Sequence, residues 1–448
     1  MRTLLALALL CAPAAFADRR EVTLAEALGL AQKNSHDLKA AQAQAGVAKA
    51  QAERVIGAFL PELTAQGSLV HTTAPAVLDF GQTIQLVGGV YQLQPKDTSL
   101  IPAPISIVGA NSAYGTLLAS QLLFTPQMIL LPAAKEGTEA ARLGALEAQE
   151  QVLLNVARLY LGLEGLVELE RAAKDAEGVA LKRERDAAAQ VKIGTAVEVA
   201  SLRAQSETAQ ARNTLAQLQG NREGLEAMLS AICGEPVRAL SGGPKPDLGP
   251  AAEEAAEPWE KTYAVRASVL GAQAAGRFPL ADKLSFLPTI VAQVKGNFSS
   301  NPGFTGKSAT ADFILAANIP LYDRGARYSQ LHEDEAKAAA AASMVDATRA
   351  KAKATWVGAK ANLAAAQTAL EQAEAQLALA TRAQKQLDAA VQLGAATSLE
   401  LSDIDNKRFF AASAAAQARA QLDIRKVELA AAEGRLAGAF GLAQNDEK

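Results

Sequence analysis

Aromatic residues and cysteines are scarce in this chain of 448 residues. Only 4% of the residues are aromatic, although half are hydrophobic by a set that includes alanine. A conventional globular core would need more Phe, Trp and Ile. Alanine is the strongest helix former and lets helices approach closely, so the composition indicates long packed helices. Cys11 lies near the N-terminus, and Cys233 is the other cysteine, so no internal disulfide is expected in the exported chain.

The chain also lacks a strong charge of either sign and a long apolar run. Its formal net charge is −3, and the charged residues are spread along the sequence rather than gathered in a basic patch. This excludes a typical nucleic-acid-binding protein. No segment after the N-terminal stretch approaches the ~18 apolar residues of a transmembrane helix. An exported chain without such a helix can still cross a membrane as β-strands of a closed barrel.

Patterns that indicate catalysis are absent as well. The three histidines, His36, His71 and His332, are scattered and form no HExxH-like metal spacing. The Gly88-Gly89 pair lacks the lysine and the following helix of a phosphate-binding loop. No nucleophile signature occurs. The sequence therefore predicts a protein that is not an enzyme, with no catalytic, metal or cofactor site.

The N-terminus has the pattern of a signal peptide over residues 1–17. Arg2 supplies the positive charge, residues 4–10 form a short apolar core, and Ala15-Phe16-Ala17 is a small-residue cleavage site. The mature chain is expected to begin at Asp18. Cys11 is a poor candidate for lipid attachment because two leucines precede it where small residues are needed.

Two proline motifs and two glycine breaks indicate that the chain is a duplicated unit. Phe59-Leu60-Pro61 and Phe286-Leu287-Pro288 each open a stretch of alternating polar and apolar residues, which predicts helix–strand elbows at Pro61 and Pro288. Long Ala-rich stretches are broken at 191–196 and 391–396, each around one glycine. We predict a first repeat at 18–233, a Pro-, Gly- and acid-rich linker at 234–258, and a second repeat at 259–448.

Four strand-like segments are predicted, two in each repeat. They lie at about 61–71, 112–124, 288–299 and 308–322. About ten residues of alternation is the length that spans a bilayer as a tilted strand. Four strands cannot close a barrel, and open edges in lipid are not viable, so the chain must oligomerise; three copies supply twelve strands. The roughly 40-residue loop between the first two strands is left without a predicted structure.

Six helical stretches surround these strands. A capping box of Thr23 and Glu26 starts the first of them. They are predicted at about 23–58, 127–190, 197–232, 259–284, 326–391 and 398–442.

The segment Thr23-Leu24-Ala25-Glu26-Ala27-Leu28 through Asn34, followed by 37–41, resembles the opening of the TolC-type outer membrane efflux protein family. The resemblance continues through both Phe-Leu-Pro elbows, the strand exit at 319–327 and both glycine turns, and it covers nearly all of the mature chain. The first strand exit, 124–127, departs from the family pattern because it lacks a glycine. The resemblance implies a mainly α fold with a membrane β-barrel. Long coiled helices would form an α-barrel, and four strands per chain would contribute to a trimeric 12-stranded barrel.

The resemblance also implies roles for particular residues. The glycine turns would form the periplasmic, adaptor-docking tip, where a helix pair reverses and glycine permits the φ that the turn requires. Glu400 and Asp403 would line the narrow tunnel entrance as acidic rings that favour cations. They are equally interpretable as solvated acids near a helix start, where acids are favoured anyway. No role is assigned to Glu198. The tip residues are Ile193, Gly194, Thr195, Leu393, Gly394 and Ala395.

The function expected from these observations is that of an exit duct in the outer membrane of a Gram-negative-type cell, with the helices in the periplasm. The expected partners are two further copies of the chain, a periplasmic adaptor, an inner-membrane transporter and outer-membrane lipid, with no nucleic acid. The duct would serve tripartite efflux or type I secretion. The alternative is a periplasmic adaptor-like coiled-coil protein, which would also have long Ala-rich helices but not two strand hairpins. The exported substrate, the type of pump and the open or closed resting state do not follow from the sequence.

Overall fold

The computed structural model describes the chain in seven segments: residues 19–78, 82–87, 89–95, 105–240, 242, 257–301 and 306–442. The predicted signal peptide, Cys11 and most of the predicted linker therefore lie outside the described residues.

The chain divides into two compact units. The helical unit comprises Met1–Ala48, Glu139–Leu270 and Ala342–Lys448, and the sheet unit comprises Lys49–Thr138 and Gly271–Ala341. Each unit draws on residues of both predicted repeats. The compact units thus cut across the repeat boundaries, because strands from both repeats pair in one sheet and helices from both repeats pack in one bundle.

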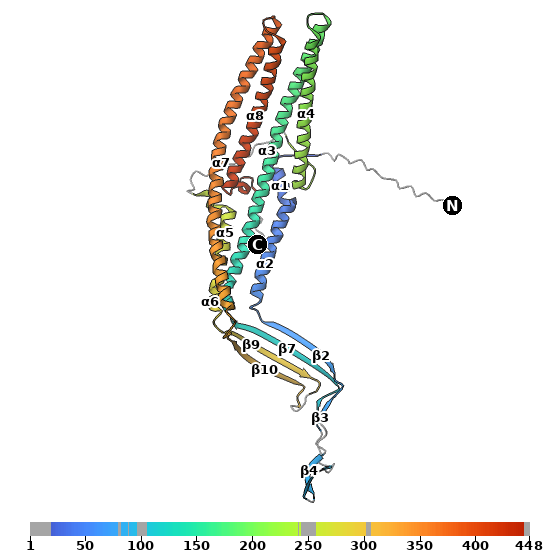
Figure 1. Ribbon diagram of the computed structural model, residues 1–448, viewed down its shortest axis with the longest axis vertical. Coiled ribbons are helices and arrows are strands. Elements are labelled where there is room, and N and C mark those ends of the chain that lie inside the picture. Colours follow the sequence, from blue (N-terminus) through green and yellow to red (C-terminus); the bar gives the residue numbers. More distant parts are fainter. Residues whose placement is uncertain are drawn as a thin grey trace, which may run out of the picture. The chain divides into compact units, whose positions relative to one another are not determined.

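Long helices dominate the structure (Figure 1). The 63 residues of α3 extend for roughly 90 Å at 1.5 Å per residue. The α-helices are α1 Leu24–Asn34, α2 His36–Gly57, α3 Leu130–Lys192, α4 Glu198–Cys233, α5 Tyr263–Ala275, α6 Phe278–Leu284, α7 Ala326–Gln392, α8 Ser398–Ala432 and α9 Leu436–Ala439, and the 3-10 turns are η1 Pro126–Ile129 and η2 Pro258–Lys261.

Three predicted helices are interrupted. The stretch predicted at 398–442 divides into α8 and α9 after Ala432. The stretch predicted at 23–58 breaks at Ser35, which has an extended ψ of 126° and ends α1. The Ser35 hydroxyl then accepts the backbone N–H of Leu38 at 3.4 Å, in the manner of a cap for α2. The stretch predicted at 259–284 divides into η2, α5 and α6. Pro279 lies in the first turn of α6, where its missing N–H costs least.

A short parallel sheet that the sequence did not predict joins the N-terminus to the residues after α4. Strand β1 Arg20–Val22 pairs with β8 Val237–Ala239, which falls in the predicted linker. The Tyr160 hydroxyl lies 3.0 Å from the Val22 carbonyl oxygen and 3.2 Å from that of Leu240, and donates its proton to this pair of acceptors. Burial raises the pKa of Tyr160 to about 12, so the hydroxyl remains a donor at any physiological pH.

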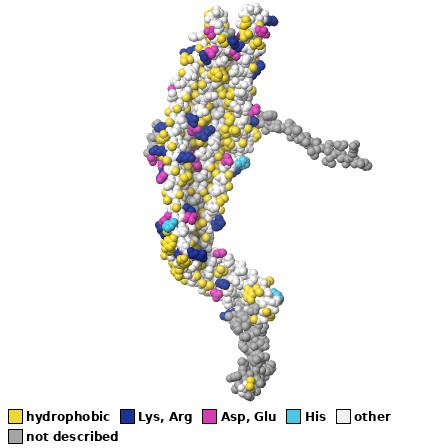
Figure 2. Space-filling view, in the orientation of Figure 1, with side chains coloured by type: hydrophobic (Ala, Val, Ile, Leu, Met, Phe, Trp, Pro, Cys, Tyr) yellow, Lys and Arg dark blue, Asp and Glu magenta, His cyan; other side chains and the backbone are white. Residues whose placement is uncertain are grey.

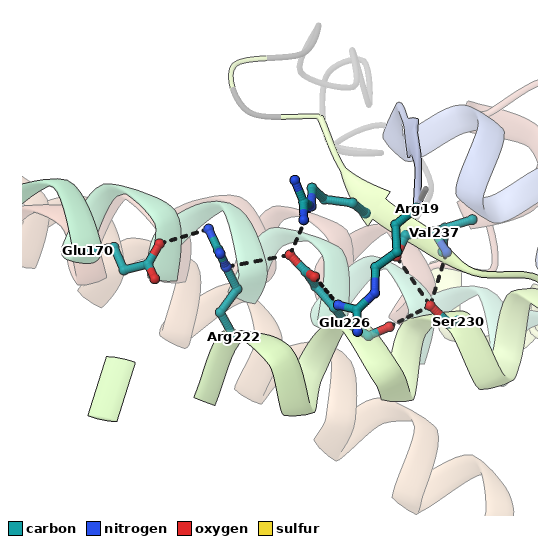
Figure 3. A network of polar contacts seen from close by, with 7 residues as sticks. Arg19, Glu170, Arg222, Glu226, Ser230 and Val237 are labelled. Atoms are coloured by element: carbon teal, nitrogen blue, oxygen red, sulfur yellow. Dashed lines mark hydrogen bonds and ion pairs between the residues drawn. The ribbon is translucent and has the colours of Figure 1, made fainter. Parts of the chain in front are cut away.

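A buried carboxylate reinforces this junction. Glu226 on α4 is 2% exposed and faces Arg19, Arg222 and Arg238, with the last two at 3.6 Å (Figure 3). Ser230, one turn further along α4, accepts the Val237 N–H at 3.0 Å. A carboxylate buried this deeply is stable only when cations pair with it, so the three guanidinium groups explain its position.

The largest group of buried apolar residues lies around the same junction. It combines residues of β1, α1, the middle of α3, the end of α4, β8 and the C-terminal helices. Val22, Leu28, Leu153 and Leu229 are fully buried there. The packing of these elements explains why the ends of the described chain are held against the middle of α3.

The sheet unit contains one antiparallel sheet of four strands in the order β10-β9-β7-β2 (Figure 1). The strands are β2 Glu62–His71, β7 Asn111–Phe124, β9 Thr289–Ser299 and β10 Ala309–Asn318. Three of them lie close to the predicted ranges. The fourth ends at Asn318 rather than near residue 322, and Pro320, which has no N–H for a strand ladder, lies two residues further on.

The strand register aligns one row of apolar residues from all four strands on the same face. Leu63 is opposite Ala119, Ala119 is opposite Val294, and Val294 is opposite Phe313. The other face carries Thr64, Ser120, Gln293, Lys295 and Asp312 at alternating positions. The apolar face is open in the single chain, because Phe313 is 82% exposed and Leu69 is 89% exposed.

The connection between β2 and β7, predicted only as a loop, contains four further strands. They form two separate two-stranded sheets, β3 with β6 and β4 with β5. Gly89, with a φ of 84°, lies in the turn that joins β4 to β5. These strands are β3 Ala76–Leu78, β4 Gln82–Val87, β5 Val90–Pro95 and β6 Ile105–Val108.

Within the described part of the chain, no helix combines the length and the hydropathy that are needed to span a bilayer.

Candidate functional site

The two glycine turns have the same backbone structure. Gly194 and Gly394 adopt φ values of 79° and 73°, in the left-handed region that favours glycine. In the first turn the Gly194 N–H donates to the Val191 carbonyl oxygen at 3.0 Å, and the next N–H donates to that of Gln190 at 2.9 Å. The second turn repeats both bonds at equivalent positions, from Gly394 to Val391 and from Ala395 to Ala390. Each turn thus ends one long helix and starts the reversal into the next.

Both turns present apolar side chains to solvent. Ile193 is 72% exposed and Leu393 is 84% exposed, and Val197 and Leu399 are also exposed nearby. The α3–α4 turn and the α7–α8 turn lie at the same end of the helical unit (Figure 1). The predicted tip residues are therefore brought together at one end of the bundle.

Glu400 lies in the first turn of α8, within a capping box. Its Oε2 atom accepts the backbone N–H of Thr397 at 2.8 Å, while the Thr397 hydroxyl accepts the Glu400 N–H at 3.2 Å. These hydrogen bonds, the backbone one first, lower the pKa of Glu400 below its ordinary value. The side chain is exposed and stays ionised, and the cap accounts for its position without reference to a tunnel.

Asp403, one turn further along α8, forms an ion pair with Lys407. The Asp403 Oδ2 and Lys407 Nζ atoms are 2.6 Å apart, and both side chains are more than half exposed. The lysine offsets part of the negative charge that the sequence assigned to this position. Of the two acids in the predicted gate, Glu400 therefore carries the less compensated charge.

The sequence did not predict a charged bridge between the two helical hairpins. Arg183 on α3 lies 3.2 Å from Asp388 on α7 and 3.2 Å from Asp405 on α8. Gln384 donates to the second oxygen of Asp405 at 2.5 Å. Asp405 is largely buried and Arg183 is about one-fifth exposed, so solvent screens this pair less than the surface pair at Asp403.

A second link joins the hairpins close by, where the Ser402 hydroxyl on α8 donates to Glu207 on α4 at 2.8 Å. Both links border a cavity of about 260 Å³ between α3, α4, α7 and α8, and Phe409 contributes to its lining. In this part of the bundle the helices are thus joined by polar contacts that border a cavity. The sequence gives little indication of these contacts, because each charged residue taken alone has the pattern of a solvent-exposed helix face.

The predicted elbows have a common turn at the end of the preceding helix. The Leu60 N–H donates to the Gly57 carbonyl oxygen at 3.0 Å, and the Leu287 N–H donates to that of Leu284 at 2.9 Å. Pro61 and Pro288 follow these turns and directly precede β2 and β9. Each proline therefore lies where a helix ends and a strand begins.

The return from sheet to helix in the second half is more elaborate. Asp323 accepts the Arg327 Nε–H at 2.6 Å and the Gly325 N–H at 3.1 Å, and the Arg327 guanidinium stacks 4.5 Å from the Phe286 ring centroid. Arg324 has a φ of 58°, which is strained for a side-chain-bearing residue. The hydrogen bonds of Asp323 and Arg327 fix the backbone of this turn and so stabilise Arg324 in its strained conformation.

The remaining sequence candidates are dispersed. His36 lies on α2 and His332 on α7, while His71 ends β2, where its Nδ1 atom is 2.8 Å from the Asn111 side-chain oxygen. Within the described residues, no three His, Cys, Asp or Glu side chains are grouped so as to hold a metal ion. On the face shown in Figure 2, basic and acidic side chains alternate along the helices and form no single-sign field.

Comparison with known proteins gives a consistent result. Residues 265–435 match the model of the outer membrane efflux protein family. No curated protein matches the chain in sequence.

Solved structures match over nearly the whole chain. Crystal structures of CusC, from a study of channel folding and transmembrane channel formation, align with 16% identity and a TM-score of 0.77 over 92% of each chain. The Campylobacter jejuni CmeC outer membrane channel aligns with 16% identity and a TM-score of 0.76, covering 95% of this chain and 87% of that one. The Vibrio cholerae outer membrane protein VceC aligns with 17% identity and a TM-score of 0.73, covering 92% and 96%. At these identities the likeness establishes the fold of an outer membrane channel of this architecture, and residues 265–435 are similar in sequence to the outer membrane efflux protein family.

Proposed function

We propose that three copies of this chain form an exit duct through which substrates pass from the periplasm, or from an inner-membrane pump, to the exterior. The observation that carries the proposal is the four-stranded sheet. In the described chain, β2 and β10 each pair on one side only, with β7 and β9 respectively. At a strand edge that is open to lipid, each unpaired backbone N–H or C=O group would cost several kcal/mol, so both edges require partners. Pairing of β10 in one copy with β2 of the next joins three sheets into one closed sheet of twelve strands.

The two faces of the sheet support the same arrangement. The strands are 10 to 14 residues long, which suits a tilted crossing of a bilayer. The face with Leu63, Val294 and Phe313 suits contact with acyl chains, whereas the face with Thr64, Lys295 and Asp312 suits a water-filled interior. Closure with the apolar face outward satisfies both sets of side chains at once.

A periplasmic adaptor remains the competing function, because the paired helical hairpins alone would fit it. The exposed sheet face argues against it. Phe313, Leu315 and Leu69 would lie in water in an adaptor, and such an apolar patch on a soluble protein is an aggregation hazard.

The decisive experiment is membrane fractionation followed by native mass spectrometry of the purified full-length chain. A duct requires detergent for extraction, separates with the outer membrane and appears as a trimer. Release by a salt wash as a stable monomer without detergent would instead identify an adaptor.

The glycine turns are the proposed contact with a periplasmic adaptor. The two turns share the same pair of backbone hydrogen bonds, lie at the same end of the helical unit and expose Ile193 and Leu393, so a partner with a repeated helical tip could pack on both. A photo-crosslinking amino acid at Leu393 tests this contact in intact cells. Crosslinks to an inner-membrane-anchored periplasmic protein are expected, and crosslinks to that protein from Phe313 alone would contradict the proposal.

Glu400 and Asp403 are the proposed acidic entrance. In a trimer the two positions would place six carboxylates around the axis, and the low pKa of Glu400 keeps its charge at the pH of the periplasm. A negative ring at a constriction concentrates cations by field focusing. The capping role of Glu400 is compatible with this one, since the cap fixes the direction of the carboxylate without neutralising it.

The sequence holds no nucleotide-binding motif, and we assign the driving energy to an inner-membrane transporter. In this proposal that partner chooses the transported substrate.

A further inference from the structure

Glu150, in the middle of α3, is a buried acid with too few partners. The residue is 5% exposed, and the buried apolar residues Leu153 and Leu154 follow three and four positions later on the same helix, while Leu436 precedes its hydrogen-bond partner Ala437. Its Oε1 atom accepts the backbone N–H of Ala437 at 3.2 Å, and its Oε2 atom is buried without a hydrogen-bond partner. A carboxylate accepts up to about four hydrogen bonds, so a single one leaves its charge poorly compensated.

The partner of Glu150 belongs to the C-terminal segment, residues 433–442. This segment turns back after α8, forms the short helix α9, and packs Leu436 and Phe440 against the apolar cluster around β1, α1 and α3. The hydrogen bond from the Ala437 N–H to Glu150 joins the segment to this part of α3. Any change in the charge of Glu150 therefore acts on the attachment of the segment.

The charged groups near Glu150 do not neutralise it. Glu147, one turn earlier on α3, is itself negative and raises the cost of a second negative charge. On the C-terminal segment, Glu433 and Arg435 pair with one another, so the arginine is already engaged. Burial first, and then the charge of Glu147, raise the pKa of Glu150 to about 7 against the pull of the Ala437 N–H.

We propose that Glu150 is a proton-controlled clasp, which holds residues 433–442 against α3 when it is neutral and loosens them when it ionises. The neutral acid keeps its carbonyl oxygen available for the Ala437 N–H and carries no desolvated charge. Ionisation places an uncompensated charge in the apolar cluster, and the charge is relieved when the segment opens and water reaches the carboxylate.

The direction of the pH dependence follows from linkage. The pKa is raised in the closed state, to about 7, from an ordinary value of 4.5 in the open state. The contribution to closure is therefore complete below pH 4.5 and is lost as the pH rises through 7. Between pH 5.5 and pH 8 the opening equilibrium should shift roughly tenfold to thirtyfold towards the open segment.

Hydrogen–deuterium exchange on the purified full-length chain in detergent tests the clasp. Peptides covering 433–442 should exchange roughly tenfold to thirtyfold faster at pH 8 than at pH 5.5 after correction for intrinsic exchange rates. The isosteric change Glu150→Gln should abolish this difference and keep the segment protected at both pH values. Asp175→Asn, which removes an exposed acid from the same helix, serves as the matched control and should keep the wild-type profile.

Infrared spectroscopy provides a second measurement that does not depend on the stability of the variant. The carboxyl C=O band of a protonated buried acid should disappear between pH 6 and pH 8 in the wild type and be absent from Glu150→Gln. A wild-type segment with no pH dependence, or a Glu150→Gln variant with the full wild-type dependence, would overturn the proposal.

Discussion

The Arg183 guanidinium lies 3.2 Å from the carboxylate of Asp405, a residue 222 positions further along the sequence, and so connects α3 with α8. The same guanidinium reaches Asp388, so one arginine on the first hairpin holds two acids on the second. Few other polar contacts join the hairpins near the turns, and a cavity lies beside this one.

Removal of this bridge should loosen the two hairpins relative to each other. Arg183→Ala leaves the largely buried Asp405 without its cation, and a loss of roughly 1–2 kcal/mol in stability is expected. The distribution of distances between spin labels at positions 197 and 399, measured by double electron–electron resonance, should broaden. Asp403→Asn breaks an exposed pair instead and should leave both the stability and the label distances within error.

A side chain at Gly394 should strain the second turn through its backbone alone. A Cβ atom there would meet nothing within 4 Å, so steric clash plays no part, but the φ of 73° costs a side-chain-bearing residue about 1–2 kcal/mol. Gly394→Leu should abolish crosslinking to the adaptor and export while the trimer still assembles. Gly358→Ala, in the open interior of α7, should be neutral or slightly stabilising. Full export by Gly394→Leu would remove the turn from the docking site.

Charge removal at the proposed entrance should reduce cation selectivity without unfolding α8. In the double variant Glu400→Gln with Asp403→Asn, the glutamine can still cap Thr397, so little change in thermal stability is expected. Single-channel recordings should show weaker selectivity for cations and weaker block by multivalent cations. Glu198→Gln changes the matching helix start on α4 and is the control. Unchanged selectivity in the double variant would leave Glu400 with its capping role alone.

The two faces of β10 should respond differently to a positive charge. Phe313→Lys places an ammonium on the apolar face, at a predicted cost of about 2–4 kcal/mol at the centre of a bilayer. Trimer yield in the outer membrane should fall sharply. Thr310→Lys, on the opposite face of the same strand, should assemble normally. Equal yields for the two variants would mean that the apolar face does not contact lipid.

The features predicted from the sequence are those with local signals. Glycine permits the positive φ of a helix reversal, and proline cannot continue a helix. The sequence therefore predicted the turns at Gly194 and Gly394. The alternation of polar and apolar residues in β9 and β10 is also a local signal, and it predicted both strands. The predicted fold and the predicted resemblance to the outer membrane efflux protein family were confirmed by the comparisons.

The features that were missed depend on distant partners. Strand β1 has three residues and no periodicity of its own, and it is a strand only because β8 lies beside it. The Arg183 bridge requires knowledge of which helix faces meet. In the sequence Glu150 resembles any exposed acid of a long helix, because its burial depends on the packing of the distant C-terminal segment. The roles of Glu400 and Asp403 at an entrance stay predictions, since they depend on the axis of a trimer.

The pairing of β1 with β8 imposes an order on the folding of the chain. Arg19 and Glu226 lie 207 positions apart, so the first strand has no partner until the ribosome has made, and the cell has exported, the whole α3–α4 hairpin. The contacts between α3 and α4 are close in sequence, so we expect the hairpin to form early, whereas closure of the 207-residue loop has a high contact order and is expected late. We therefore expect the pairing of β1 with β8 to be the last folding event in the first half of the chain. In a refolding experiment, the time at which β1 becomes protected would mark the completion of the junction.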